Sequence, residues 1–199
     1  MIDNCTENDL KKLMGSKKRL TNLSFVSFAV STKLLKCVSE NLVDLKTLSL
    51  QDYTGISLQS IQSICKLENL KELDISYCNG ISDDALIVNL RKLQVLKIEQ
   101  IEEITDVELG GKSNLKEFYC RGCTKLEDSS LINLLKCAAN LEIINIEECT
   151  KITKSVIDVA IQVTKVRTNN VVLDLYVNGT SIHIDKIKEN SPLLHLHYR

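Results

Sequence analysis

Hydrophobic residues recur along this chain in a pattern that repeats about every 25 residues. The pattern is clearest at 70–86, LKELDISYCNGISDDAL, where apolar side chains occupy the first, fourth, sixth, ninth and twelfth positions. One such unit is too short to bury its own apolar face, so it must stack against similar neighbours. The copies begin at Leu20, Leu45, Leu70, Leu93, Leu115, Leu141, Asn170 and Leu193. Spacings of 22 to 29 residues between these starts predict a solenoid of stacked repeats.

Each copy contains a short stretch in which apolar and other residues alternate. Alternation with a period of two predicts a strand with one buried face, here at the fourth and sixth positions. The paired fourth and sixth residues are Leu23 and Phe25, Leu48 and Leu50, Leu73 and Ile75, Leu96 and Ile98, Phe118 and Cys120, Ile144 and Ile146, Leu173 and Leu175, and Leu196 and Tyr198.

After each strand the chain is expected to turn and form a helix. The turn is expected at the ninth position, which holds Phe28, Tyr53, Cys78, Ile101, Cys123, Cys149 and Asn178. Ser or Thr then precedes apolar stripes with helical spacing in 82–90, 128–138 and 153–161, which predicts capped helices. Only a stub of helix is expected at 108–112, because it contains two adjacent glycines. The predicted fold class is α/β, a right-handed horseshoe with a parallel concave sheet and convex helices.

The pattern LxxLxLxxCxxI(S/T)D, with a second cysteine near a helix end at Cys137, resembles the cysteine-containing leucine-rich repeats of F-box proteins and of their relatives without an F-box. The resemblance covers essentially the whole chain. It implies a protein-protein recognition module, the substrate-binding part of an SCF-type (F-box) E3 ubiquitin ligase in ubiquitin-dependent protein degradation. In that family a separate F-box connects the repeats to the adaptor subunit of the ligase.

The chain departs from this plan at its N-terminal end. An F-box is rich in leucine and proline, whereas the single proline here is Pro192. We therefore expect the ligase adaptor as a partner only if an F-box lies upstream. Cys5 precedes Leu20 by the interval that separates Cys78 from Leu93, so residues 1–19 are interpreted as a truncated half-repeat. Residues 20–199 are then one domain of about eight leucine-rich repeats, the last incomplete, in a fragment of a longer protein or a shortened paralogue.

Two other functions stay open at this point. One is a free-standing leucine-rich repeat scaffold or regulator with no link to ubiquitin. The other is a protein inhibitor of the ribonuclease-inhibitor kind, which resembles this chain in its reduced cysteines and acidic concave face. The repeats of such inhibitors alternate between two longer lengths, and the repeats here do not.

Composition narrows the classes of partner. A net charge of −1 gives no electrostatic basis for binding nucleic acid. No segment is apolar enough to cross a bilayer, and the acidic N-terminus does not resemble a targeting peptide, so we expect a cytoplasmic or nuclear protein that does not bind membranes. The eight cysteines occupy equivalent core positions, which favours reduced thiols over disulfides.

Partner recognition is expected on the concave face, at the third, fifth, seventh and eighth positions of the repeats. Seven acidic and two basic side chains fall there between the third and seventh copies, and Val172 and Val177 are assigned to the same face. Lysines and arginines gather instead in or beside the helices, at Lys33, Lys36, Lys66, Arg91, Lys92, Lys136, Lys165, Lys186 and Lys188. The predicted partner-binding residues are Glu72, Asp74, Tyr77, Lys97, Glu99, Glu117, Tyr119, Arg121, Asn145, Glu147, Glu148, Asp174 and Tyr176.

This distribution of charge predicts a protein partner with a basic, extended segment, and the tyrosines would act as aromatic anchors. A solvated strand face carries charged residues by default, so an acidic face without a partner is an equally open alternative.

No catalytic or metal-binding pattern stands out. Cys120 and Cys123 have the spacing of half a zinc site, but they occupy the sixth and ninth repeat positions, which predicts buried thiols. His195 and His197 share one face of a strand near Asp174 and Tyr176, and a solvated pair is the favoured interpretation over a metal site. We expect no enzyme activity, no cofactor and no bound metal.

Overall fold

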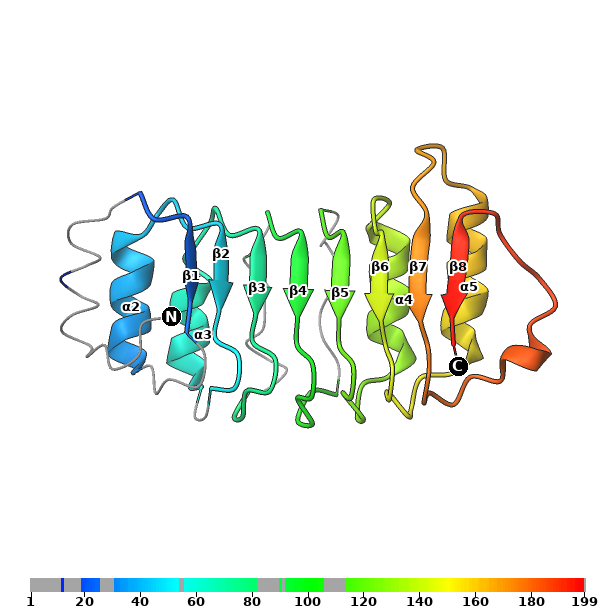
Figure 1. The fold of residues 1–199 in the computed structure, drawn as a ribbon, viewed down its shortest axis with the longest axis horizontal. Helices are drawn as coiled ribbons and strands as arrows, with labels where there is room; N and C mark the ends of the chain where they lie inside the picture. Colours follow the sequence, from blue (N-terminus) through cyan, green and yellow to red (C-terminus); the bar gives the residue numbers. More distant parts are fainter. Residues whose placement is uncertain are drawn as a thin grey trace.

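A computed structural model of the chain describes residues 12, 19–25, 31–53, 56–81, 90, 92–105 and 114–198. In this part of the chain, eight parallel strands form one sheet in which spatial order follows chain order (Figure 1). The strands are β1 (Asn22–Ser24), β2 (Thr47–Ser49), β3 (Glu72–Asp74), β4 (Val95–Lys97), β5 (Glu117–Tyr119), β6 (Ile143–Asn145), β7 (Leu173–Tyr176) and β8 (Leu194–His197). The predicted stack of repeats with one parallel sheet is confirmed.

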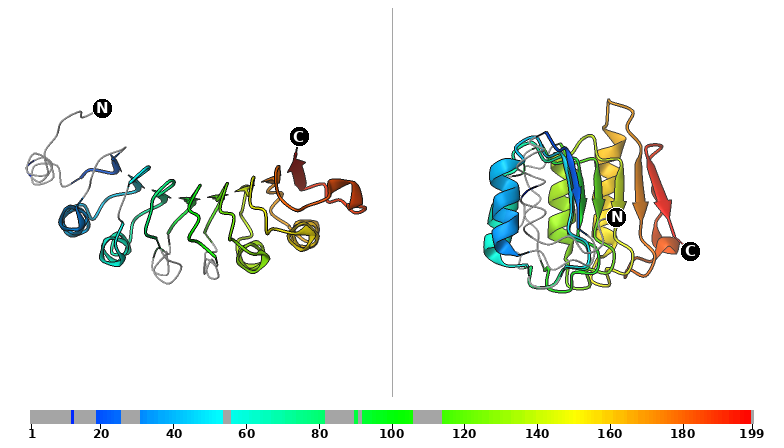
Figure 2. Two further views of the ribbon diagram at one scale, coloured as in Figure 1. Left: turned by 90° about the horizontal axis from the view of Figure 1, so that it is seen from below. Right: turned by 60° about the vertical axis from the view of Figure 1, so that its left-hand side comes forward.

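The four described α-helices cover the same side of this sheet, and the short 3₁₀ helix lies beside its C-terminal end. The strands form the inner arc of a curved ribbon and the helices form its outer arc, as Figure 2 shows. Neighbouring helices pack against each other in the pairs α2 with α3 and α4 with α5. The helices are α2 (Thr32–Asn41), α3 (Leu58–Ile64), α4 (Asp128–Cys137), α5 (Lys154–Lys165) and the short 3₁₀ helix η2 (Ile184–Lys186). The prediction of a concave sheet and convex helices is therefore confirmed.

Local sequence accounts for the starts of α2, α3 and α5. The Ser or Thr cap predicted for α4 is wrong, because this helix follows Glu127, whose side chain makes no capping hydrogen bond. The side chains of Ser31, Ser57 and Thr153 each accept a hydrogen bond from a backbone N–H in the first turn of the following helix. Such caps stabilise a helix by about 1 kcal/mol. The predicted apolar stripes of α4 and α5 face the core. The helices predicted in 82–90 and 108–112 lie outside the described residues, apart from the buried Leu90.

The fourth-position side chains form a continuous row through the core. The row consists of Leu23, Leu48, Leu73, Leu96, Phe118, Ile144, Leu175 and Leu196. From Leu48 to Leu175 each of these residues is at most 1% exposed. The predicted register is confirmed for the first six copies and for the eighth.

The seventh copy departs from its predicted register by two residues. Leu175 of β7, and not Leu173, pairs with Ile144 of β6. The copy therefore begins at Val172 rather than at Asn170. Thr180 follows as its ninth residue, so the assignment of Asn178 to that position is wrong.

The shift also corrects the face of one valine. Val177, predicted on the concave face, is 3% exposed and belongs to the core. Val172 precedes β7 and is partly buried. Asp174 and Tyr176 keep their place on that face, now as the third and fifth residues of the copy.

A loop after α5, 166–172, absorbs the extra residues and rises above β7 in Figure 1. The guanidinium of Arg167 donates hydrogen bonds to the carbonyls of Leu141 and Val171, both at 2.9 Å. The side-chain amide of Asn169 donates to the carbonyl of Ala139 at 3.0 Å. Asn170 has a φ of 57°, a left-handed conformation that asparagine tolerates better than most residues. These contacts close the loop against the preceding repeat.

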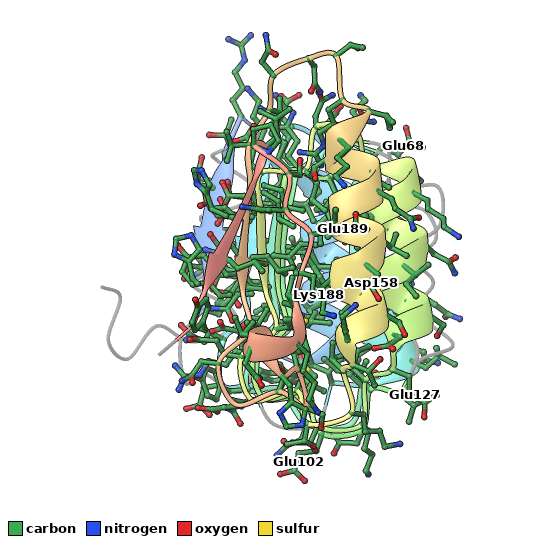
Figure 3. All side chains as sticks on the ribbon, turned by 90° about the vertical axis from the view of Figure 1, so that its right-hand side faces the viewer. Glu68, Glu102, Glu127, Asp158, Lys188 and Glu189 are labelled. Carbon is green, nitrogen blue, oxygen red and sulfur yellow. The ribbon has the colours of Figure 1, made fainter. Side chains whose placement is uncertain are left out.

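The end of the sheet gives a further correction. Tyr198 was assigned to a buried sixth position, but the residue is 57% exposed. It follows β8, and no described strand lies beyond β8 to cover it. The connection between β7 and β8 instead covers the side of α5. Figure 3 shows Lys188 and Glu189 of this connection near Asp158 of α5, with which they line a hollow of about 380 Å³.

Ninth-position cysteines join successive repeats through their thiols. Each thiol donates a hydrogen bond to the sixth-position carbonyl of the preceding copy. The bonds run from Cys78 to Leu50 (3.0 Å), from Cys123 to Ile98 (3.0 Å) and from Cys149 to Cys120 (3.1 Å). These cysteines are therefore structural residues that connect each repeat to its neighbour.

The burial predicted for Cys120 and Cys123 is confirmed, because neither residue is exposed. Burial raises the pKa of Cys78 to about 11 and that of Cys123 to about 12, so both thiols are protonated at neutral pH. Within the described ranges the seven cysteines are free, and no group of three or more His, Cys, Asp or Glu side chains has an arrangement that could hold a metal ion. No helix in the described part of the chain is long and apolar enough to span a membrane.

Candidate functional site

Third- and fifth-position side chains of the strands form the concave face. The third-position row is Asn22, Thr47, Glu72, Val95, Glu117, Ile143, Asp174 and His195, and the fifth-position row is Ser24, Ser49, Asp74, Lys97, Tyr119, Asn145, Tyr176 and His197. The remaining predicted site residues, Tyr77, Glu99, Arg121, Glu147 and Glu148, directly follow these strands at the seventh and eighth positions. The structure thus brings the predicted site residues together along one side of the sheet.

The eighth position of the repeats has a left-handed backbone. Its φ is between 56° and 73° at Asp52, Tyr77, Gln100, Gly122, Glu148 and Gly179. This conformation costs an ordinary L-residue about 1–2 kcal/mol, so the stacking of the repeats must impose it. Tyr77, one of these residues, is 44% exposed. The recurrence of this conformation at Gly179 agrees with the corrected register of the seventh copy.

Both basic residues of the face already have acidic partners. The Lys97 ammonium lies 3.2 Å from a carboxylate oxygen of Glu72 and 5.7 Å from the ring centre of Tyr119. The Arg121 guanidinium lies 2.6 Å from a carboxylate oxygen of Glu148. The hydrogen bond from Arg121 lowers the pKa of Glu148, so this carboxylate is ionised at neutral pH.

Five acidic side chains of the face remain without a lysine or arginine partner among the described residues. They are Asp74, Glu99, Glu117, Glu147 and Asp174. The carboxylate of Glu117 accepts a hydrogen bond from the Tyr119 hydroxyl at 2.9 Å, which is a neutral donor. The excess negative charge is therefore a property of the assembled face and not only of its composition.

Glu99 lies at the centre of this excess charge. Its pKa is raised, first by partial burial and then by the nearby carboxylate of Asp74, while Arg121 and Lys97 oppose the rise and Glu147 adds to it. A raised carboxyl pKa means that the surroundings of Glu99 disfavour its negative charge. A cation placed beside Glu99 would relieve this unfavourable interaction.

Hydrogen bonds within each strand end hold two of the polar residues in place. The side chains of Asp74 and Asn145, both at the fifth position, accept the backbone N–H of Ser76 and Glu147 at 3.0 Å. The buried hydroxyl of Ser76 in turn accepts the backbone N–H of Glu99 at 3.2 Å. These bonds fix the backbone that carries Glu99 and Glu147.

Residues that the sequence did not single out complete the face. The side-chain amide of Gln100 donates to Glu148 at 3.3 Å, across the intervening repeat. Gly122 makes this possible, because a Cβ at that position would lie 2.3 Å from the Gln100 amide nitrogen. A sequence signal existed in the glycine at an eighth position, but it does not reveal which side chain occupies the space.

At the last two strands, two histidines surround one acid. A carboxylate oxygen of Asp174 lies 2.7 Å from Nε2 of His197 and 3.4 Å from Nδ1 of His195. The ring of His197 stacks on Tyr176 with 4.3 Å between ring centres. The predicted proximity of these four residues is confirmed. Their contacts bind β7 to β8 and leave Asp174 less available to a partner than Glu99.

Charge on the convex side is mixed rather than uniformly basic. Several of its lysines pair with acids, as in Lys36 with Glu40 and Lys165 with Glu189. Arg91, predicted to belong to this side, lies outside the described residues. The predicted excess of acidic residues on the concave face is therefore found, whereas the predicted basic character of the helix side holds only in part.

Comparison with known proteins addresses the fold. No protein-family model matches the sequence, and no curated protein matches it. Among solved structures, the yeast Rad7 and Elc1 complex is 18% identical with a TM-score of 0.62, and the match covers 98% of this chain and 58% of that chain. An internalin (inlF) from Listeria monocytogenes is 20% identical with a TM-score of 0.64, and the match covers 94% of this chain and 55% of the internalin chain.

A third structure, a complex of TLR13 with ssRNA13, is 16% identical with a TM-score of 0.56, covering 98% of this chain and 31% of that chain. All three similar structures contain leucine-rich repeats. The chain folds as a leucine-rich repeat solenoid. It spans less than two thirds of the length of each of these three chains. At this level of identity the similarity establishes the fold and no finer subtype.

Proposed function

We propose that this leucine-rich repeat chain is a non-catalytic recognition module whose concave face binds a basic, extended segment of a partner protein. The observation that supports this most directly is the group of five acids, centred on Glu99, that have no lysine or arginine partner among the described residues. Such a surface attracts and orients a positively charged partner. Tyr77, Tyr119 and Tyr176 supply the aromatic contacts that commonly dominate binding energy. The chain is proposed to act in the cytoplasm or nucleus.

A peptide-binding measurement tests this proposal. The probe is a fluorescein-labelled ten-residue peptide of alternating arginine and serine, and fluorescence anisotropy gives its Kd. We expect the variant Glu99→Lys/Glu147→Lys to weaken binding by about tenfold or more at low salt, because it reverses two charges in the centre of the face. We expect binding by the wild type to weaken with added salt, since the side chains are solvent-accessible.

The matched control is Glu68→Lys/Glu102→Lys. Figure 3 labels both residues: Glu68 lies beside the helix layer, and Glu102 lies at a turn beyond the strand ends. Both residues are exposed, and the double substitution makes the same change in net charge. We expect this control to alter the Kd by less than about twofold at physiological salt. Equal losses in the two variants, or no binding by the wild type, would contradict the proposal.

We further propose that the module belongs to a ubiquitin ligase of the F-box type, as its substrate-binding part. The support is the ninth-position cysteine pattern that resembles those proteins, together with the similarity in fold to Rad7, whose structure is a complex with Elc1. The alternative is a scaffold that regulates a partner by covering its surface. Affinity purification of the endogenous full-length protein distinguishes them: a stoichiometric ligase adaptor subunit supports the ligase, and its absence supports the scaffold.

A further inference from the structure

A second charged surface lies outside the concave face. An open hollow of about 500 Å³ occupies the edge of the sheet where the first strands begin, which is the upper edge in Figure 1. Four of its lining residues are basic and one is acidic. The lining residues are Arg19, Thr21, Asp44, Lys46, Asn69, Lys71 and Lys92. We call Arg19, Lys46, Lys71 and Lys92 with the hollow between them the basic groove.

A regular backbone ladder supports the basic groove. The N–H of Lys46 donates to the carbonyl of Thr21, and the N–H of Lys71 donates to the carbonyl of Lys46, both at 2.7 Å. Each of these carbonyls also accepts the N–H of the residue that follows the lysine, at 2.9 Å. The two lysines occupy the same position in adjacent repeats, so their backbones are held about 4.8 Å apart, the usual spacing of strands.

Most of the positive charge in the groove is not neutralised by the residues that the structure describes. Among the described residues, no carboxylate lies within 4 Å of the charged groups of Arg19, Lys46 or Lys71. Lys92 donates to the Asn69 side-chain oxygen at 2.8 Å, which is a neutral partner.

The adjoining part of the same edge behaves differently. Lys116 occupies the position equivalent to Lys46 and Lys71 two repeats further on, and it pairs with Glu142 at 3.0 Å. The groove is therefore a local feature of the first three repeats and not a general property of this edge.

We propose that the basic groove binds an acidic segment of a protein partner through its side-chain carboxylates. Ammonium and guanidinium groups around an open hollow are complementary to such a segment. A peptide fits better than a nucleic acid, because no aromatic side chain lines the hollow to stack on a base. This binding is independent of the binding of a basic segment on the concave face.

The test uses fluorescein-labelled hexaglutamate, with hexaglutamine as the uncharged probe, in anisotropy titrations of the full chain at low salt. Lys46→Glu/Lys71→Glu is expected to weaken hexaglutamate binding by about tenfold or more. The matched control Lys125→Glu/Lys136→Glu makes the same change in net charge at exposed lysines on and before α4. At the same salt concentration we expect it to weaken binding several-fold less than the groove variant does, because its lysines lie away from the hollow.

The neutral variant Lys46→Gln/Lys71→Gln accompanies the charge reversal, and thermal unfolding checks that each variant folds. An intermediate loss of affinity in the folded neutral variant supports direct contact. Binding of hexaglutamine as strong as that of hexaglutamate, equal losses in the control, or no binding of hexaglutamate by the wild type would overturn the proposal. Tighter binding of a six-nucleotide single strand than of hexaglutamate would also overturn it in favour of a nucleic acid site. Glu99→Lys/Glu147→Lys is expected to retain hexaglutamate binding. A failure of the basic-groove proposal is therefore distinguishable from a failure of the concave-face proposal.

Discussion

The ninth-position thiol illustrates how one residue type serves several repeats. The side chain is small enough to be buried where the chain leaves the strand. Its S–H donates a hydrogen bond to a backbone carbonyl of the preceding copy, and a buried carbonyl needs such a donor. Cys78, Cys123 and Cys149 all make this contact, at 3.0–3.1 Å. A role in stacking explains these cysteines without redox or metal chemistry.

The thiol pKa values predict how stability depends on pH. Burial raises the pKa of Cys78 from 9.0 in the unfolded chain to about 11. Below pH 9 the Cys78 thiol is protonated in both the folded and the unfolded chain, so the stability that this buried thiol contributes is fully present. Between about pH 9 and 11 the unfolded state loses its proton while the folded state keeps it, so folding is progressively disfavoured, by about 1.4 kcal/mol per pH unit for one thiol.

Urea denaturation at pH 8 and at pH 11 measures this effect. The loss of unfolding free energy between the two pH values is expected to be about 2 kcal/mol smaller in Cys78→Ala than in the wild type, because one titrating group has been removed. The control Ile81→Val creates a small cavity in the same repeat and is expected to lower stability equally at both pH values. A Cys78→Ala profile parallel to that of the wild type would contradict the assigned pKa.

At the scale of the elements, the loop between α5 and β7 decides the register of the seventh copy. Leu173 and Leu175 are both apolar and two residues apart, so either fits the fourth position of the pattern. The choice of Leu175 depends on how the preceding loop closes. Arg167 closes it by joining its own loop to Leu141 at the start of the previous repeat.

We expect Arg167→Ala to lower the free energy of unfolding by about 1–3 kcal/mol, because two carbonyls lose a charged hydrogen-bond donor. Urea denaturation monitored by circular dichroism measures the change. The control Lys165→Ala removes an exposed pair with Glu189 and is expected to cost less than about 1 kcal/mol. A loss for Arg167→Ala no larger than that of the control would show that the loop does not depend on this side chain.

For the whole molecule, a solenoid places each repeat in contact only with its neighbours. Core residues of inner repeats are covered from both sides, whereas those of outer repeats have fewer neighbours. Leu73 in β3 is 1% exposed, and the equivalent Leu23 in β1 is only partly buried. Stacking also gathers acids from five successive repeats on the concave side.

We therefore expect unequal costs for one substitution at two equivalent positions. Leu73→Ala should lower the unfolding free energy by about 2–5 kcal/mol, the usual range for a fully buried leucine. Leu23→Ala should cost about half as much or less, because partial exposure reduces the apolar surface that folding removes from water. Urea denaturation of both variants checks this comparison, and equal costs would show that β1 is as well covered as β3.

The sequence by itself determined the repeat, the strand faces, the cap of α5 by Thr153 and the burial of the sixth- and ninth-position cysteines. These features depend on local periodicity and on side-chain chemistry within a single copy, so a reader of the sequence can place Leu73 inside and Asp74 outside. Most of the candidate site followed from the same periodicity, including the acidic residues and the proximity of His197 to Asp174.

Only the tertiary structure decided the register of the seventh copy and the charges that remain on each surface. Lys97 neutralises Glu72 from 25 residues away, and Gln100 reaches Glu148 across 48 residues. Within the described part of the chain no carboxylate lies within 4 Å of the Lys46 or Lys71 ammonium, whereas Lys116 pairs with Glu142. Such pairings depend on distances between side chains of different repeats and on the space that Gly122 leaves open. Those distances exist only once the repeats have stacked.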